Sequence, residues 1–181
     1  MMLVAEAAPR SGVDLVAAEA AVGDLLDALG HDRSDPRLRL TPARVARNLA
    51  DLVTRTPLPD STLLDSTDYT GLVLVRDIPF HSLCEHHLLP FRGIVHVGYL
   101  PAGKLVGLSL LPRIVEYCAR DLQMQERLTT QIADLIESMT KARGVGVEIV
   151  AEHLCMSVRG VGTPAVTATT REFRGELTGF Q

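Results

Sequence analysis

The chain has 181 residues, of which 46% are hydrophobic, so it is long enough to fold around a core. Eighteen basic and 22 acidic residues give a net charge of −4, which argues against a basic nucleic-acid-binding surface. The apolar runs fall short of the roughly 20 residues that a membrane helix needs. Three cysteines and an N-terminus without a secretion signal predict an intracellular protein in the reducing cytoplasm.

The first third of the sequence has helical periodicity. Apolar residues recur at helical spacing up to Leu29, and Gly30 is placed to end that helix. A second helix is predicted from Thr41, a capping residue that is followed by a proline. We therefore expect an N-terminal helical extension over residues 1–56. Residues 57–69, which are rich in Pro, Ser, Thr and Asp, are expected to form a linker.

The remaining residues, 70–181, have the pattern of an α+β domain. Two β-rich runs precede two amphipathic helical segments, and a run of one or two strands follows Gly144, which is expected to end the second helix. The prediction is an antiparallel four-stranded sheet with two helices on one face, and its two open edges must be covered or paired with another subunit. The expected strands lie within 71–78, 94–99 and 145–158, and the helical stripes within 111–122 and 128–139.

Cysteines and histidines from two distant segments form the sharpest local feature. Cys84 and His87 are three residues apart, so a tight turn can direct both to one point. His153 and Cys155 are two apart in a strand-like segment, so they are expected on one face. Thiolate and imidazole ligands suit Zn²⁺. Two cysteines and one histidine leave a fourth position for water, whose pKa zinc lowers to about 7.

Two other interpretations of this cluster stay open. A further histidine ligand would give a closed Cys₂His₂ structural site. Alternatively, Cys155 is simply a small buried apolar residue. If the metal instead has three protein ligands and a water, His86 and His153 would transfer protons beside it. Cys118 lies in a helical stripe and is expected in the core.

Basic residues form a second candidate cluster. Ser109 precedes a predicted helix start, and a helix N-terminus with converging arginines would bind a polyphosphate, although solvated helix faces are the alternative. Gln125 and Glu126 begin the next helical stripe, where a carboxylate can accept two N–H bonds from a guanine-like edge while backbone groups bind the neighbouring carbonyl. The arginines concerned are Arg44, Arg47, Arg113 and Arg159.

These segments resemble the GTP cyclohydrolase I family. The similarity extends over residues 39–170, most of the chain, and the matching motifs occur in the family's order. The motifs are Thr41–Arg47, Cys84–His87, His96–Pro101, Gly107–Ser109, Arg113–Val115, Gln125–Leu128 and His153–Gly160.

The resemblance implies a tunnelling fold whose sheets join into an oligomeric barrel. It implies a homodecamer of two pentamers with the pocket between subunits, and zinc-dependent hydrolysis of GTP at C8 that releases formate and forms 7,8-dihydroneopterin triphosphate. Cys84, His87 and Cys155 match the zinc ligands, and His86 and His153 match the histidines that handle protons. Gln125 and Glu126 match the guanine-binding pair, whereas Ser109, Arg113, Arg159, Arg44 and Arg47 match the triphosphate contacts.

Two features depart from the family pattern. Leu110 stands where the family has a phosphate-contacting lysine, a loss that could cost about 1.5–3 kcal/mol of binding. The sequence after Thr170 is also shorter than the helical tail usual in the family. The alternative interpretations are a paralogue that opens the ring of a purine nucleotide with fewer phosphates, in a specialised pathway, and a zinc- and nucleotide-binding oligomer without turnover.

Overall fold

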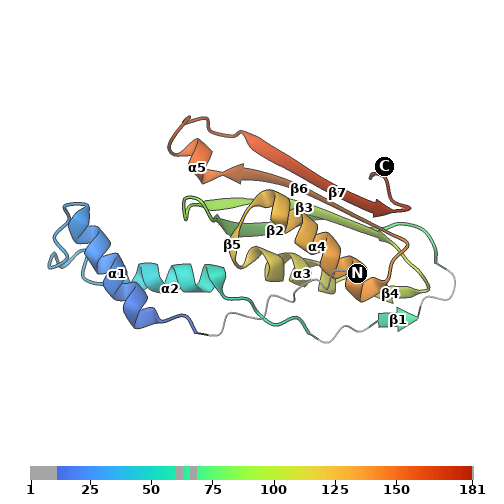
Figure 1. Cartoon of the computed structure of the whole chain (residues 1–181), viewed down its shortest axis with the longest axis horizontal. Coiled ribbons are helices and arrows are strands. Elements are labelled where there is room, and N and C mark those ends of the chain that lie inside the picture. The colour runs from blue at the N-terminus through green and yellow to red at the C-terminus, as the bar shows by residue number, and fades with distance from the viewer. Residues whose placement is uncertain (1–11, 60–62, 66–68, 181) are drawn as a thin grey trace. The chain divides into compact units, whose positions relative to one another are not determined.

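The structure is a computed structural model that describes residues 12–59, 63–65 and 69–180 (Figure 1). The chain divides into two compact units, with the boundary between Arg55 and Thr56. Within the described ranges, no helix has the length and apolar character needed to cross a membrane.

Two helices that pack against each other make up the described part of the N-terminal unit. They are α1 (Leu15–Ala28) and α2 (Thr41–Val53). The chain leaves α1 through Gly30, whose φ of +82° lies in the region that favours glycine. The prediction that Thr41 caps α2 is wrong, because Leu40 is the N-cap and Thr41 is already helical. The proline after Thr41 lies in the first turn, where its missing N–H is not needed.

The second unit is built on one large, mainly antiparallel sheet with the strand order β5-β2-β3-β6-β7. A two-residue strand, β5, runs parallel to β2 at its edge. A separate pair, β1 and β4, places a short strand inside the segment predicted to be a linker. The strands are β1 (Leu63–Asp65), β2 (Val73–Cys84), β3 (Pro90–Leu100), β4 (Lys104–Val106), β5 (Leu122–Gln123), β6 (Gly144–His153) and β7 (Thr167–Gly175).

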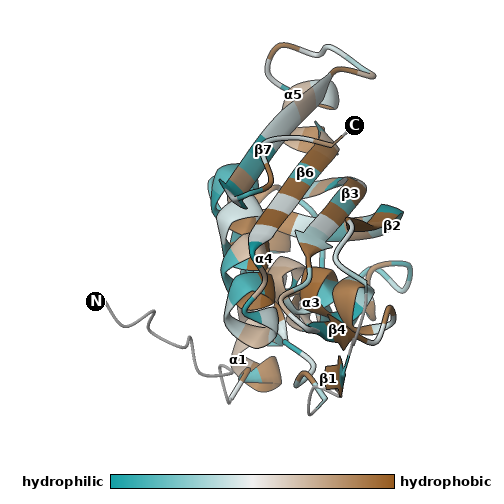
Figure 2. Ribbon diagram, turned by 90° about the vertical axis from the view of Figure 1, so that its right-hand side faces the viewer, coloured by the Kyte–Doolittle hydropathy of each residue, from teal (hydrophilic) through white to brown (hydrophobic). Residues whose placement is uncertain are grey.

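Two helices cover one face of this sheet, as Figure 2 shows. α3 (Leu110–Ala119) packs on β2, and α4 (Gln125–Thr140) packs on β6 and β7. The predicted apolar stripes of both helices are buried, together with the inward-facing residues of the strands. The α+β class with two helices on one face of the sheet is therefore confirmed, but the sheet has five strands rather than the predicted four, because the two-residue β5 adds to β2 in parallel. Fully buried core residues include Leu111, Ile114, Leu128, Ile132, Ile136, Val97 and Ile149.

One local prediction for this unit is wrong, and another is met only in part. The residue after α4 that adopts the left-handed conformation is Lys141, with φ of +51°, whereas Gly144 begins β6. The run 145–158 does not form two strands, because β6 ends at His153 and one turn of helix, α5 (Leu154–Ser157), follows it. The fourth long strand is β7, which is mostly exposed and has no apolar alternation to reveal it.

Gly93 marks the tightest approach between β3 and β6. A Cβ at Gly93 would lie 1.9 Å from the carbonyl oxygen of Val150. We predict that Gly93→Ala lowers the free energy of unfolding by about 2 kcal/mol or more, because the paired strands must separate. Gly107→Ala is the matched control, since a Cβ there meets no atom within 4 Å. Denaturant unfolding should give similar stability for Gly107→Ala and the wild type, and equal losses in both variants would contradict the β3–β6 register.

Candidate functional site

Three strand ends meet at one end of the large sheet. β2 ends at Cys84, β6 ends at His153, and β3 begins between them with Phe91 directly opposite His153. A tight turn follows Cys84, whose carbonyl oxygen accepts a hydrogen bond of 2.9 Å from the N–H of Leu88. The turn holds His87 over the end of β2. The segments that carry the cysteine and histidine motifs therefore lie side by side.

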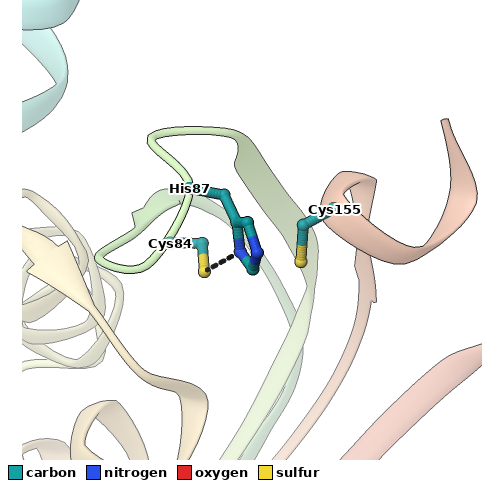
Figure 3. Close-up of side chains that lie close together, drawn as sticks. All are labelled: Cys84, His87 and Cys155. Atoms are coloured by element: carbon teal, nitrogen blue, oxygen red, sulfur yellow. Dashed lines mark hydrogen bonds between the residues drawn. The ribbon is translucent and has the colours of Figure 1, made fainter. Parts of the chain in front are cut away.

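Two sulfurs and a ring nitrogen come together at this point. The ligand atoms of Cys84, His87 and Cys155 lie within 4.8 Å of one another, with the His87 ring between the two sulfurs in the view of Figure 3. Cys84 Sγ is 3.6 Å from His87 Nδ1. A sulfur and a nitrogen bound to one tetrahedral zinc are about 3.5 Å apart, given Zn–S and Zn–N bonds of about 2.3 and 2.0–2.1 Å. The three residues therefore fit a zinc ion.

Cys155 reaches the cluster from the helical turn α5. The expectation that Cys155 and His153 project from one face of a strand is wrong, because the strand ends at His153. Burial and the neighbouring Cys84 raise the pKa of the Cys155 thiol, whereas the Arg159 guanidinium acts in the opposite direction. A metal ion that is bound by the Cys155 sulfur must therefore displace the proton of this thiol.

His153 is held on two sides beside the cluster. Its ring stacks on Phe91, with centroids 4.7 Å apart and planes within 3°. Its Nε2 lies 2.8 Å from Oε1 of Gln125. The Gln125 amide nitrogen donates to two backbone carbonyls and a threonine hydroxyl, each at 3.1 Å, so its oxygen is the acceptor for His153. The His153 proton therefore sits on Nε2 and leaves the lone pair of Nδ1 free.

The surroundings of His153 favour its neutral ring. Burial lowers its pKa below the ordinary value of 6.5, and the nearby Glu126 carboxylate opposes that shift without reversing it. Glu126 itself is exposed in the first turn of α4. The first N–H groups of a helix have no partner within the helix, so this end of α4 offers a carboxylate next to backbone donors.

Gln125 has a role that the sequence did not indicate. Its side chain is 2% exposed, and both of its polar atoms are bonded within the protein. The bonds link His153 to the backbone of β6 and β7. In this structure a ligand beside α4 would therefore meet the backbone of Gln125 rather than its amide group.

A second link that sequence reasoning missed supports the turn after Cys84. Arg127 Nη2 donates to Glu85 Oε2 at 2.5 Å and to the carbonyl oxygen of Leu122 at 2.7 Å. Glu85 Oε1 in turn lies 3.5 Å from Nε2 of His86, whose side chain is 60% exposed. Because 42 residues separate Arg127 from Glu85, no local pattern in the sequence could reveal their contact.

Comparison with known proteins agrees with this geometry. Residues 18–179 match the GTP cyclohydrolase I family. GTP cyclohydrolase 1 of Rhodopirellula baltica is 46% identical over 171 residues, which cover 93% of this chain and 75% of the relative. That of Streptomyces griseus is 48% identical over 165 residues, or 88% and 82% of the two chains.

The chain belongs to the GTP cyclohydrolase I family. It is an enzyme of that hydrolase type, and its sheet with two helices on one face is the tunnelling fold expected of the family. The crystal structure of the archaeosine synthase QueF-Like in the apo form is also similar, with 17% identity and a TM-score of 0.49, covering 61% of this chain and 99% of that one.

The positions that match the family's triphosphate contacts do not all gather at the cluster. Arg159 is close enough to affect Cys155. Ser109 and Arg113 are exposed at the N-terminal end of α3, whereas the carbonyl oxygen of Ala119, at the opposite end of this helix, accepts a hydrogen bond from Ser82 on β2. Arg113 precedes the last helical residue, Ala119, by six positions, or about 9 Å of helix rise. Ser109 and Arg113 therefore lie at the end of α3 away from Ser82.

Two of the predicted phosphate contacts belong to the other unit of the chain. Arg44 and Arg47 are exposed on α2, in the N-terminal unit. Leu110, which replaces the family lysine, is 5% exposed and belongs to the hydrophobic core of the second unit. This position therefore offers no cation to a ligand.

Removal of one sulfur provides a direct test of the candidate metal site. We predict that Cys155→Ala lowers zinc affinity by at least about 100-fold, because the remaining two ligands cannot hold the ion in a structural or catalytic coordination sphere. Cys118→Ala is the matched control, since Cys118 is a fully buried core cysteine outside the cluster. The zinc content after dialysis measures how much zinc each of the two variants retains. Equal zinc retention by the two variants would contradict the assignment.

Proposed function

We propose that this chain is a zinc-dependent GTP cyclohydrolase. It hydrolyses the guanine ring of GTP at C8, releases formate and yields 7,8-dihydroneopterin triphosphate. Membership of the GTP cyclohydrolase I family supports the substrate and the reaction. The observation that carries the zinc dependence is the convergence of Cys84, His87 and Cys155, with a neutral histidine beside them.

Cys84, His87 and Cys155 would hold the metal. Two thiolates and one imidazole suit zinc, and three protein ligands are the number found in catalytic zinc sites. When bound, zinc supplies a Lewis acid that lowers the pKa of a coordinated water to about 7. We place the enzyme in the reducing cytoplasm, where thiolate ligands stay unoxidised.

Glu126 and the start of α4 would bind the guanine base. The exposed carboxylate can accept two parallel hydrogen bonds, one from N1–H and one from the exocyclic amine of guanine. The N–H groups in the first turn of α4, including that of Gln125, have no partner within the helix and can donate to the guanine carbonyl. This arrangement recognises the base with one fixed charge and with backbone groups that cannot rotate away.

Two histidines would move protons beside the reacting carbon. His153 presents an unprotonated Nδ1, fixed by the Gln125 contact at Nε2 and by the stack on Phe91, so it can accept a proton from water and return it to a ring nitrogen. His86 is more exposed, and its Nδ1 lies 4.0 Å from Cys84 Sγ. Gln125 is then a positioning residue for His153.

The triphosphate would be bound by Arg159 of one chain together with Ser109 and Arg113 of another. Within a single chain those two residues lie at the end of α3 away from Ser82, which favours a pocket shared between copies. The edges of the sheet, which are β7 on one side and β2 beyond its two-residue pairing with β5 on the other, can pair with neighbouring copies. We expect the family's assembly, a homodecamer of two pentamers, with Arg44 and Arg47 as further phosphate contacts.

One observation favours a second candidate substrate. Leu110 is buried where the family has a phosphate-contacting lysine, so the phosphate site has one cation fewer. A charge-assisted contact contributes about 1.5–3 kcal/mol. A purine nucleotide with fewer phosphates is therefore the alternative substrate, with the same ring-opening chemistry.

Product analysis tests the leading proposal. Zinc-loaded protein incubated with GTP is expected to release formate and, after oxidation, a fluorescent pterin, both detected by mass spectrometry. Absence of formate with GTP and with every other guanine nucleotide would reject the cyclohydrolase proposal. His153→Ala should keep its zinc but lose about 10²–10⁴-fold in turnover, because the proton acceptor is gone. A zinc-free His153→Ala protein would show that His153 has a different role.

A nucleotide series distinguishes the two substrates. If the arginines bind all three phosphates of GTP, kcat/KM should fall in the order GTP, GDP, GMP. The expected decrease is about tenfold or more for each phosphate that is lost. Steady-state formate release measures the three values. A higher kcat/KM for GDP or GMP than for GTP would favour the alternative substrate instead.

A further inference from the structure

A row of polar side chains crosses the sheet face that carries no helix. His96 on β3 pairs with Glu148 on β6, and Glu148 pairs with Arg171 on β7. Their neighbours along β3 and β6 are buried under α3 and α4, so alternation along the strands places the row on the opposite face. Arg171 Nε donates to the Glu148 carboxylate. The buried neighbours are Val95, Val97, Val147 and Ile149.

A β-bulge adds a second arginine to this row. Two residues of β2, Arg76 and Asp77, lie opposite the single residue His96, and Asp77 has a φ of +58°. The Asp77 N–H donates to Nδ1 of His96 at 3.1 Å. A neutral His96 ring therefore carries its proton on Nε2 and presents a donor there. Bulges redirect side chains, and this one directs Arg76 toward the same hollow as His96.

These four polar residues line a cavity of about 450 Å³ whose other wall is aromatic. Phe173 and Phe180 meet edge to face there, with ring centroids 5.1 Å apart. Phe180 lies directly over β6, where a Cβ at Gly146 would come within 2.8 Å of its ring. The cavity thus has a charged side and an apolar side, and its volume is in the range of small-molecule sites.

The charges of the cavity are unbalanced. Arg171 is paired with Glu148, but Arg76 has no ion pair or hydrogen bond with any other described residue. Two guanidinium groups and an imidazole N–H therefore face one carboxylate. The cavity is also separate from the metal-ligand cluster, because His96 lies five residues along β3 from Phe91, or about 17 Å.

We propose that this cavity is a second binding site, for a small organic anion. The carboxylate or phosphate group of the ligand binds Arg76 and Nε2 of His96, and its apolar body packs against Phe173 and Phe180. Glu148 limits the affinity, because it occupies Arg171. This site does not depend on the reaction at the metal cluster.

Calorimetric titration of the full-length protein with benzoate, benzamide and inorganic phosphate tests this proposal. Benzoate is expected to bind, and Arg76→Gln should weaken it by about tenfold or more, the effect of losing one charge-assisted contact. Arg92→Gln is the matched control: Arg92 is an exposed β3 arginine that faces Glu152, outside the cavity. Glu148→Gln should tighten benzoate binding several-fold, because it releases Arg171.

Each contrary outcome would overturn the proposal. Benzamide that binds as tightly as benzoate would exclude recognition of charge, and phosphate that binds without benzoate would exclude the aromatic wall. Equal benzoate affinity in Arg76→Gln and Arg92→Gln, or no benzoate binding, would exclude the site. Thermal unfolding verifies that each variant is folded. If Arg76→Gln is unfolded, Arg171→Gln replaces it; this change leaves the Glu148 carboxylate unpaired in the cavity and is also expected to weaken benzoate binding.

Discussion

The pairing of β3 with both β2 and β6 is the constraint on which the rest of the site depends. Leu83 pairs with Pro90 and Phe91 pairs with His153, so the last residues of β2 and β6 flank the start of β3. This register brings Cys84 and Cys155 together although 71 positions separate them in the sequence (155 − 84). A shift of one residue would turn the side chains at these strand ends to opposite faces. The close approach of Gly93 to β6 fixes the register at the same end of the sheet.

The sequence was sufficient for the features that have local signals. Helical periodicity predicted α2, α3 and α4, and the buried faces of α3 and α4 are the predicted stripes. The spacing of Cys84 and His87 predicted a turn, and the structure has one there. The relation to a known family came from motifs in a fixed order, and the comparisons confirm it. In each case, the signal lies in short stretches of neighbouring residues, taken one at a time or in a fixed order.

The features that the sequence did not reveal depend on contacts between distant segments. β7 is a threonine-rich, exposed strand that pairs with β6. No alternation of apolar residues along β7 predicts this pairing. The family resemblance implied that the Gln125 side chain binds the base. In the structure, this side chain forms hydrogen bonds with residues 24 to 45 positions away. The Arg127–Glu85 pair and the bulge at Arg76 likewise require two strands or elements to be placed first. Local propensity cannot determine such contacts.

The central claim is that two sulfurs and one imidazole nitrogen from these strand ends hold one zinc ion. X-ray absorption at the zinc edge of the purified protein measures the coordination shell directly. The account predicts two sulfur atoms at about 2.3 Å, together with nitrogen or oxygen ligands at about 2.0–2.1 Å. A coordination shell of nitrogen and oxygen ligands alone, without sulfur, would contradict the claim.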